Sequence, residues 1–428
     1  MIRSDIVARD KAHVWHPYTS IDAYEGIDPI VVARAEGSTL IDVDGKRYLD
    51  GNSSWWVAAL GHGHPRLRRV LREQSETLAH CALAGITHEP AARLAEELVA
   101  IAPKGLRRVF YTDNGSGSVE VAVKIALQTW QQRGAKGKTR FVALDGAFHG
   151  DTLGATSLGG VDVFKRPFAS VLFDCVRAPF PDADGYARAF DAIASMVVEE
   201  RDSLAAVVVE PIVQGAAGMR IYDPAYLREL RELTRANDVL LIVDEVFAGY
   251  GRTGAMWASE HAGITPDVMC IGKAFSAMIP MGATLVTEDV FDAFRGGKEN
   301  TLYYGHTFCG NPIGAALARE VLAIYRDEDV VGQAKRKGAR ITAAFDAIAA
   351  LPGVARVRSL GMIGAADLDA SSSYFGERGW KVYEAAKARG AYVRPLGDTV
   401  YVAPPLVIDE AELDRLLAIV AESVKTTT

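Results

Sequence analysis

The chain has 428 residues, of which 49% are hydrophobic and 24% charged, a balance typical of a folded globular protein. Its formal net charge is −7 and no block of like charge occurs, which argues against a nucleic-acid or anionic-membrane partner. No apolar run approaches the roughly 20 residues that span a bilayer, and the first residues lack a secretory-signal pattern. The four cysteines are scattered without a CxxC pair, so no disulfide framework is predicted and we expect a cytoplasmic protein.

The middle of the chain alternates short apolar segments with longer amphipathic ones. The short segments are apolar continuously rather than at every second residue, which is typical of strands covered by helices on both faces. Such strand–helix alternation predicts an α/β fold with a mostly parallel sheet. The expected strands are 108–112, 140–144, 205–210, 239–244 and 268–271, and the expected helices include 118–132 and 225–236.

A chain of this length favours two domains sharing a large core. Glycine and proline near 310–312 are followed by further helix and then by a mixed segment from about residue 354. We therefore predict a large domain over 61–312 and a smaller α+β domain over 313–428. The segment 1–60 is expected to pack with the small domain and at a dimer interface.

Two of the expected strands end in ionisable residues, Asp244 and Lys273. In open α/β sheets the chemistry gathers at the carboxyl ends of the strands. A partly desolvated lysine has a lowered pKa and can form an imine with a carbonyl group. An aspartate facing a pyridine nitrogen keeps that nitrogen protonated, so the ring can accept electrons. Either residue alone is more simply a solvated strand end, but together they indicate a catalytic pair.

The loop 113–118, with the sequence DNGSGS, lies between an expected strand and an expected helix. Small residues there allow backbone N–H groups to approach a phosphate at the helix N-terminus. A nucleotide-binding protein is the alternative, but Glu120 occupies the third glycine position of a dinucleotide motif and no P-loop lysine follows. Phe148 and Val246 are placed to cover the two faces of a flat ring.

These motifs together resemble the class III, fold-type-I aminotransferases, and the likeness covers nearly the whole chain. It is carried by Asp244-Glu245-Val246, then by 249–254, 266–267, Lys273 and 307–312, in that family's order and spacing. The resemblance implies a large domain with a mostly parallel sheet flanked by helices, plus a smaller α+β domain. It also implies pyridoxal 5'-phosphate as the cofactor and a homodimer with shared active sites.

Carried over position by position, the resemblance makes Lys273 the Schiff-base lysine and Asp244 the partner of the pyridine nitrogen. Arg394 would bind a substrate carboxylate, a task suited to a guanidinium, and Arg252 is a weaker candidate for the same contact. The other implied cofactor contacts are Gly115, Ser116, Phe148, Val246, His306 and Thr307, the last reaching the phosphate of the other subunit's cofactor. The other implied substrate contacts are Tyr18, Trp55, Trp56, Phe148, Lys273 and Gly305.

Four shorter stretches resemble one branch of the family, whose members aminate 8-amino-7-oxononanoate with S-adenosylmethionine in biotin biosynthesis. They are 15–20, 53–56, 85–88 and 210–215. Phe148, Tyr304 and His306 depart from that branch's usual residues, so lysine as the donor and an ω-amino acid:pyruvate enzyme are alternatives.

A metal enzyme built on His62 and His64 is a third alternative. The two histidines flank Gly63 and no carboxylate lies near them in the sequence. We interpret them as structural loop residues and predict no metal site.

Overall fold

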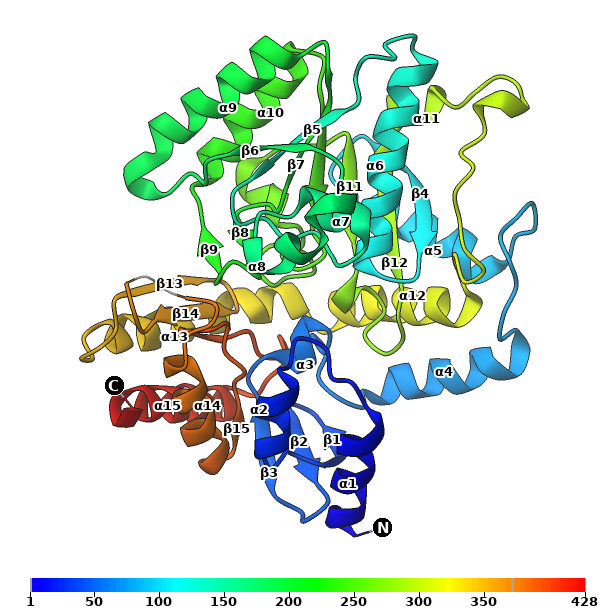
Figure 1. Ribbon diagram of the computed structural model, residues 1–428. Helices are drawn as coiled ribbons and strands as arrows, with labels where there is room; N and C mark the ends of the chain where they lie inside the picture. Colours follow the sequence, from blue (N-terminus) through cyan, green and yellow to red (C-terminus); the bar gives the residue numbers. More distant parts are fainter. Residues whose placement is uncertain (1, 371–372, 428) are drawn as a thin grey trace.

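The structure is a computed structural model that describes residues 2–370 and 373–427. The large central sheet and its helices fill the upper half of Figure 1, and the N-terminal segment and the C-terminal part of the chain lie below it. In the described part of the chain, no helix combines the length and the apolar character that crossing a membrane requires.

The central sheet has seven strands in the order β4-β12-β11-β10-β7-β5-β6. Its strands are β4 (Leu106–Thr112), β5 (Arg140–Leu144), β6 (Cys175–Ala178), β7 (Leu204–Val209), β10 (Leu240–Asp244), β11 (Val268–Ile271) and β12 (Gly282–Thr287). Strand β12 runs antiparallel to both of its neighbours, and the other pairings are parallel. The predicted α/β fold with a mostly parallel sheet is confirmed. All five expected strands are present, whereas β6 and β12 were missed.

Helices cover both faces of this sheet, as its continuously apolar strands require. Every residue of β7 is buried. Its Val207 and Val209 pack in one apolar cluster with α9 (Tyr186–Glu200) and α10 (Pro224–Ala236). Its Ala206 and Val208 pack in another cluster with α6 (Gly115–Gln132) on the opposite face. Since side chains alternate along a strand, one apolar strand serves both cores.

Helix α6 begins three residues earlier than expected, at the glycine-rich loop itself. The Asn114 side chain accepts a hydrogen bond from the Gly117 N–H at 2.8 Å and so caps the helix. The N-terminus of α6 therefore lies at the edge of the sheet where the parallel strands end.

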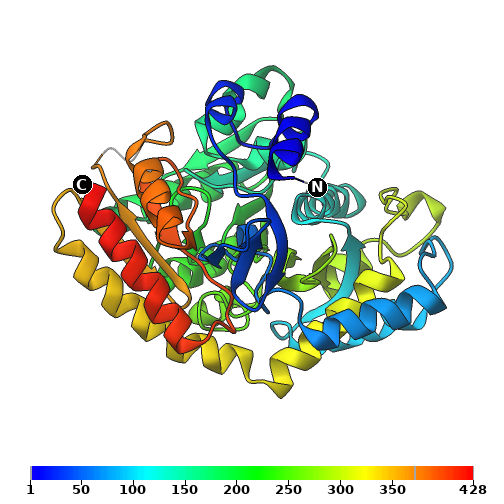
Figure 2. The ribbon, with the colours of Figure 1, turned by 90° about the horizontal axis from the view of Figure 1, so that it is seen from below.

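Below the central sheet, the two ends of the chain share a second sheet. Strand β15 (Ala391–Tyr392) pairs in parallel with β3, beside the antiparallel strands of the N-terminal segment. A third sheet, β13-β14-β16, is covered by α13 and borders the two-stranded β8–β9 hairpin, which forms a sheet of its own. Figure 2 shows α13 and α15 side by side along one flank. Helix α12 packs on α4 and α5 and then leads into α13.

The remaining strands are β1 (Val32–Glu36), β2 (Thr39–Asp42), β3 (Arg47–Asp50), β8 (Val213–Gln214), β9 (Arg220–Ile221), β13 (Arg356–Leu360), β14 (Ile363–Asp367) and β16 (Thr399–Val402). The remaining helices are α1 (Arg3–His13), α2 (Ile21–Gly26), α3 (Ser53–Trp56), α4 (Pro65–Thr77), α5 (Glu89–Ile101), α7 (Leu153–Leu158), α8 (Asp162–Lys165), α11 (Glu288–Asp292), α12 (Pro312–Asp327), α13 (Val330–Ala349), α14 (Arg378–Ala388) and α15 (Glu410–Thr427).

Candidate active site

A cavity of about 400 Å³ opens at the carboxyl edge of the central sheet, within the size range of small-molecule sites. Five strands that run in the same direction deliver lining residues to this edge, because their carboxyl ends meet there. These residues are Ser116 after β4, Phe148 after β5, Glu210 after β7, Asp244 at the end of β10 and Lys273 after β11. The full lining is Pro17, Tyr18, Trp55, Trp56, Val57, Gly115, Ser116, Phe148, His149, Gly150, Asp151, Phe164, Glu210, Val213, Gly215, Ala216, Asp244, Val246, Phe247, Lys273, Tyr374 and Leu396.

Lys273 and Asp244 share this cavity, as the sequence analysis expected. Burial lowers the pKa of the Lys273 amine, although the carboxylates of Asp244 and Glu210 act in the opposite direction. The amine lies 5.1 Å from the centre of the Trp56 ring. Lys273 also has a left-handed backbone with φ of 48°, a conformation that is costly for a residue with a side chain and is concentrated at functional sites. A lysine in this setting keeps a larger neutral, nucleophilic fraction than one in water.

Asp244 is fixed by two donors. Its Oδ1 accepts a hydrogen bond from the Val246 N–H at 3.0 Å, and its Oδ2 lies 2.8 Å from Nδ1 of His149. The His149 side chain is completely buried, and its Nε2 has no hydrogen-bond partner among the described residues. From the sequence, Phe148 was expected to stack on a ring, and the neighbouring His149 was not predicted to belong to the site. No signal in the sequence marks His149, because its burial and its contact with Asp244 arise only in the fold.

Glu210 is a second buried acid that the sequence analysis did not select. Its two carboxylate oxygens accept hydrogen bonds from the backbone N–H groups of Phe148 at 2.8 Å and Gly215 at 2.9 Å. Burial raises the pKa of Glu210 to about 7. One carboxylate therefore holds two walls of the cavity, the one carrying the Phe148 ring and the one formed by 213–216.

The glycine-rich loop forms a close cradle at the start of α6. A side chain at Gly115 would meet the Val246 side chain at 2.5 Å, so glycine keeps the loop backbone accessible from the cavity. The Ser116 hydroxyl accepts a hydrogen bond from the Asp151 N–H at 3.2 Å. Free N–H groups at a helix N-terminus favour a phosphate. The loop, the lysine and the aspartate thus fit pyridoxal 5'-phosphate, and Phe148 and Val246 line the same cavity.

Trp55 and Trp56 enter the cavity from an unusual turn. All four residues of α3 have positive φ values, from 45° to 73°, and so form one left-handed turn. The buried Asp50 carboxylate stabilises it by accepting hydrogen bonds from the N–H and the hydroxyl of Ser54, at 2.9 and 2.8 Å. His62 contacts the same carboxylate at 2.9 Å. A strained segment held in this way places two large aromatic side chains in the lining of the cavity.

The mouth of the cavity joins distant parts of the chain. The Tyr18 hydroxyl donates to Asp151, and the Arg394 guanidinium donates to the Tyr18 carbonyl oxygen at 2.8 Å. Arg394 also lies 5.4 Å from the centre of the Trp55 ring, so its charge sits at the rim rather than among the lining residues. Phe164 and Tyr374 complete the aromatic wall with ring centres 4.9 Å apart, and neither was singled out from the sequence.

Besides Arg394 at the rim, four residues considered from the sequence do not line this cavity. Gly305, His306 and Thr307 belong to a partly exposed loop, and none of them is among the described lining residues. Arg252, the weaker carboxylate candidate, is buried and donates to the carbonyl oxygens of Met362 at 3.2 Å and Pro404 at 2.7 Å. Arg252 therefore ties segments of the fold together and does not face the cavity.

His62 and His64 also take structural contacts. The sequence showed no carboxylate near them, but the fold gives each a separate one, with His62 on Asp50 at 2.9 Å and His64 on Glu328 at 3.3 Å. Across residues 2–370 and 373–427, no three His, Cys, Asp or Glu side chains are grouped so that they could hold a metal ion.

A buried lysine lies near an aspartate at the carboxyl edge of a mostly parallel sheet, beside a glycine-rich helix N-terminus. This arrangement fits the fold-type-I class of pyridoxal-phosphate enzymes. The chain belongs to the class III aminotransferases, because the family model for aminotransferase class-III matches residues 22–424. The pyridoxal-phosphate dependence implied by the sequence is thereby confirmed.

Within this family, the chain is similar over nearly its whole length to several named enzymes and solved structures. The chain is 40% identical to the adenosylmethionine-8-amino-7-oxononanoate aminotransferase of Geobacter sulfurreducens, over 98% of this chain and 97% of the relative. It is also 40% identical to the enzyme of that name from Mycobacterium leprae, over 97% and 96% of the two chains. The crystal structure of the Methanocaldococcus jannaschii enzyme of that name superposes with a TM-score of 0.96, at 31% identity and 100% coverage of both chains. An amine transaminase from an uncultivated Pseudomonas species, in its PLP-bound form, gives 0.92 at 30% identity, over 97% of this chain and 98% of the other.

Proposed function

We propose that this protein transfers an amino group from S-adenosylmethionine to 8-amino-7-oxononanoate, giving 7,8-diaminononanoate in biotin biosynthesis. The observation that carries the proposal is the aromatic cavity above Lys273, formed by Tyr18, Trp55 and Trp56 with Arg394 at its rim. A long keto acid has its carboxylate far from its carbonyl carbon. Such a molecule would suit an aromatic cavity that has a reactive amine inside it and a guanidinium at its rim. The relatives that bear this activity in their names support the assignment.

The chain's own residues divide the catalytic work. Pyridoxal phosphate, when bound, supplies an electron sink for the pair left on the substrate carbon. Lys273 would hold the cofactor aldehyde and, once released, accept and return a proton at Nζ, a role that contributes about 10²–10⁴-fold. Asp244, oriented by His149, would place a fixed negative charge at the pyridine nitrogen. Gly115 and Ser116 would bind the phosphate, and Phe148 and Val246 would enclose the ring.

The buried environment of Lys273 favours proton transfer at its Nζ. A proton-transfer group works best when its pKa lies near the working pH, and burial lowers the pKa of Lys273 in that direction. The Trp56 ring, 5.1 Å from Nζ, is part of the apolar surroundings that disfavour the charged form of the amine.

The homodimer and the three segments 1–60, 61–312 and 313–428 are part of this proposal. Gly305, His306 and Thr307 would serve the partner's cofactor, which agrees with their position outside the cavity of their own chain. Large apolar side chains are exposed around this loop, including Tyr303 at 78% and Phe308 at 56%. A second copy of the chain would cover them. The cytoplasmic location stays a prediction from the sequence.

A half-reaction tests the proposal. The purified protein should be yellow with bound pyridoxal phosphate, S-adenosylmethionine should bleach the visible band, and 8-amino-7-oxononanoate should restore it. Lys273→Ala should lack that band and show no turnover. Bleaching by lysine or by an ω-amino acid, without a response to S-adenosylmethionine, would assign the donor to one of the alternative class III activities. A wild-type protein that stays colourless with added pyridoxal phosphate would contradict the proposal as a whole.

A further inference from the structure

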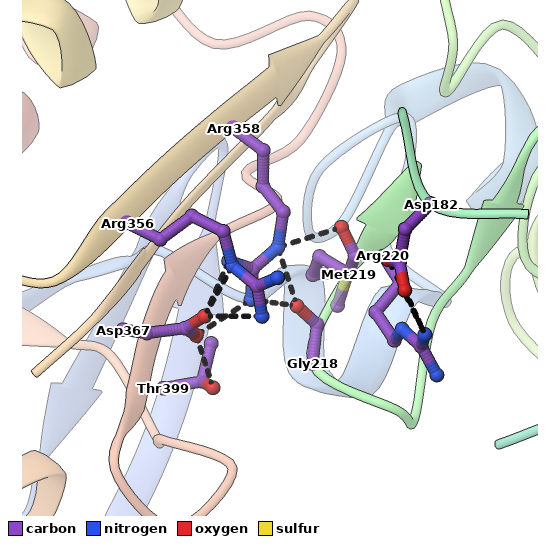
Figure 3. Close-up of polar contacts among 8 residues, drawn as sticks. All are labelled: Asp182, Gly218, Met219, Arg220, Arg356, Arg358, Asp367 and Thr399. Atoms are coloured by element: carbon purple, nitrogen blue, oxygen red, sulfur yellow. Dashed lines mark hydrogen bonds and ion pairs between the residues drawn. The ribbon is translucent and has the colours of Figure 1, made fainter. Parts of the chain in front are cut away.

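A buried cluster of charges joins the small β13-β14-β16 sheet to the β8–β9 hairpin (Figure 3). Arg358 of β13 donates to both oxygens of Asp367, at 2.8 and 2.7 Å. Its Nε also donates to the carbonyl oxygens of Gly218 at 2.8 Å and Met219 at 2.9 Å, in the turn of the hairpin. The Arg358 side chain is only 11% exposed and that of Asp367 only 2%. This guanidinium therefore links two segments that lie 140 residues apart in the sequence.

The carboxylate of Asp367 accepts hydrogen bonds from Arg356, Arg358 and Thr399. Burial would raise its pKa, but hydrogen bonds and charge from Arg358, with the Thr399 hydroxyl at 2.7 Å, overcome this effect and lower the pKa. Asp367 thus stays ionised and keeps Arg358 aimed at the hairpin. Arg356, the other arginine on this carboxylate, is 56% exposed and has no hydrogen bond to the hairpin within the described residues.

The hairpin needs such an anchor because its backbone is strained. Met219 has φ of 58° and Ile212, just before β8, has φ of 66°, both in the left-handed region. That region is costly for side chains and most of all for a β-branched residue such as isoleucine. Strained residues of this kind persist only where the surrounding structure holds them. Arg358 contacts the turn at the carbonyl of the strained Met219 itself.

A short series of contacts leads from this turn to the active-site cavity. The Met219 N–H donates to the Gly215 carbonyl at 3.0 Å, and the Gly215 N–H donates to Glu210 at 2.9 Å. Val213, Gly215 and Ala216 all line the cavity. The other oxygen of Glu210 accepts the Phe148 N–H. A shift of the hairpin turn would therefore move the cavity wall that 213–216 forms.

We propose that Arg358 is a positioning residue for the substrate pocket, which holds the β8–β9 hairpin so that Gly215 and Ala216 form the substrate-facing wall. Arg358 touches neither the cavity nor the reacting groups and acts only through the hairpin. This proposal for Arg358 depends on the proposed function in one respect, namely that the substrate binds in this cavity.

The test compares Arg358→Met with Arg356→Met. Both changes remove a guanidinium from the same strand and the same carboxylate, but only the first removes the hydrogen bonds to the hairpin. We expect Arg358→Met to raise KM by about 10- to 100-fold and to leave kcat within about threefold of wild type, because the wall contacts the substrate and not the reacting carbon. Arg356→Met should leave both constants close to wild type. Arg358→Lys, which can still donate to the Gly218 carbonyl, should restore part of the lost affinity.

Thermal denaturation separates positioning from stability. A drop in Tm for Arg358→Met with an unchanged KM would show a purely structural role and overturn the proposal, as would an equal rise in KM for Arg356→Met. If Arg358→Met does not fold, the pair Arg358→Lys and Arg356→Lys is compared in the same way, and equal KM values would again overturn it. The kinetics use whichever donor bleaches the wild-type protein. An acceptor other than 8-amino-7-oxononanoate would then refute the proposed function without affecting this test.

Discussion

Replacing His149 with alanine should lower kcat strongly while leaving the cofactor bound. His149 is buried, and its Nδ1 lies 2.8 Å from Asp244 Oδ2. Since that oxygen is an acceptor, Nδ1 carries the proton and donates it. The bond fixes one oxygen of Asp244, and the Val246 N–H fixes the other. Without His149, the aspartate could rotate away from the position in which it supports charge on the cofactor ring.

The size of the effect follows from the strength of this bond. A hydrogen bond to a charged group contributes about 1.5–3 kcal/mol. If this contribution is realised fully as charge develops during the reaction, at about 1.4 kcal/mol for each factor of ten, kcat falls by about 10- to 150-fold. The expected change lies mainly in kcat, because Asp244 acts on the cofactor and the substrate is held elsewhere in the cavity.

His149→Asn is the matched control, because the asparagine Nδ2 can take the place of the histidine Nδ1 as a donor to Asp244. Steady-state kcat is measured for both variants with saturating pyridoxal phosphate, and the visible spectrum reports whether the cofactor is bound. His149→Asn should recover a large part of the activity. Wild-type kcat in His149→Ala, or equal losses in the two variants, would refute the orienting role of this hydrogen bond.

Three further predictions follow from the same structure. Asp244→Asn should keep the cofactor band but lower kcat by about 10²–10³-fold, measured in the steady state, because an amide cannot supply the negative charge. Arg394→Ala should raise KM for the keto acid by about tenfold or more with little change in kcat, since a charge-assisted contact to a carboxylate is lost. Burial raises the pKa of Glu245 from 4.5 to about 7, so the stability that its protonated form provides is present below pH 4.5 and lost as the pH rises through 7. Glu245→Gln should flatten that part of the Tm-against-pH profile, because the amide does not titrate.

The central sheet was predictable because its strands are buried on both faces. Continuous apolar runs such as that of β7 have no other simple interpretation when helical segments separate them. Strand β12 was missed because it is antiparallel and contains glycine and threonine, which weaken the pattern. Strand β15 has only two residues, and its partner β3 lies more than 300 positions earlier in the chain. No local pattern predicts a pairing of that kind.

The active-site residues likewise fall into those that a local sequence pattern indicates and those that depend on contacts between distant positions. Lys273 and Asp244 could be selected because each follows an apolar strand, and the sheet brings such strand ends together. The contact between Tyr18 and Asp151 spans 133 residues, and the left-handed turn at Trp55 depends on the Asp50 carboxylate. His149 was overlooked because its role depends on Asp244, which is 95 positions away. Composition and periodicity carry no information about such distant pairs.

Residues at strand ends and residues in loops are expected to have different roles, the first in the chemical reaction and the second in the choice of substrate. Lys273, Asp244 and Phe148, which are expected to act on the cofactor, come from the carboxyl ends of parallel strands, where buried backbone pairing fixes their spacing. The groups expected to meet the substrate come from loops held by single side-chain contacts, such as Tyr18 by Asp151 and Gly215 by Glu210. A loop wall can change without moving a strand, because few backbone hydrogen bonds join the two. Substitutions in these walls should therefore alter which amine and which keto acid react, whereas substitutions at the strand ends should alter whether any amine reacts at all.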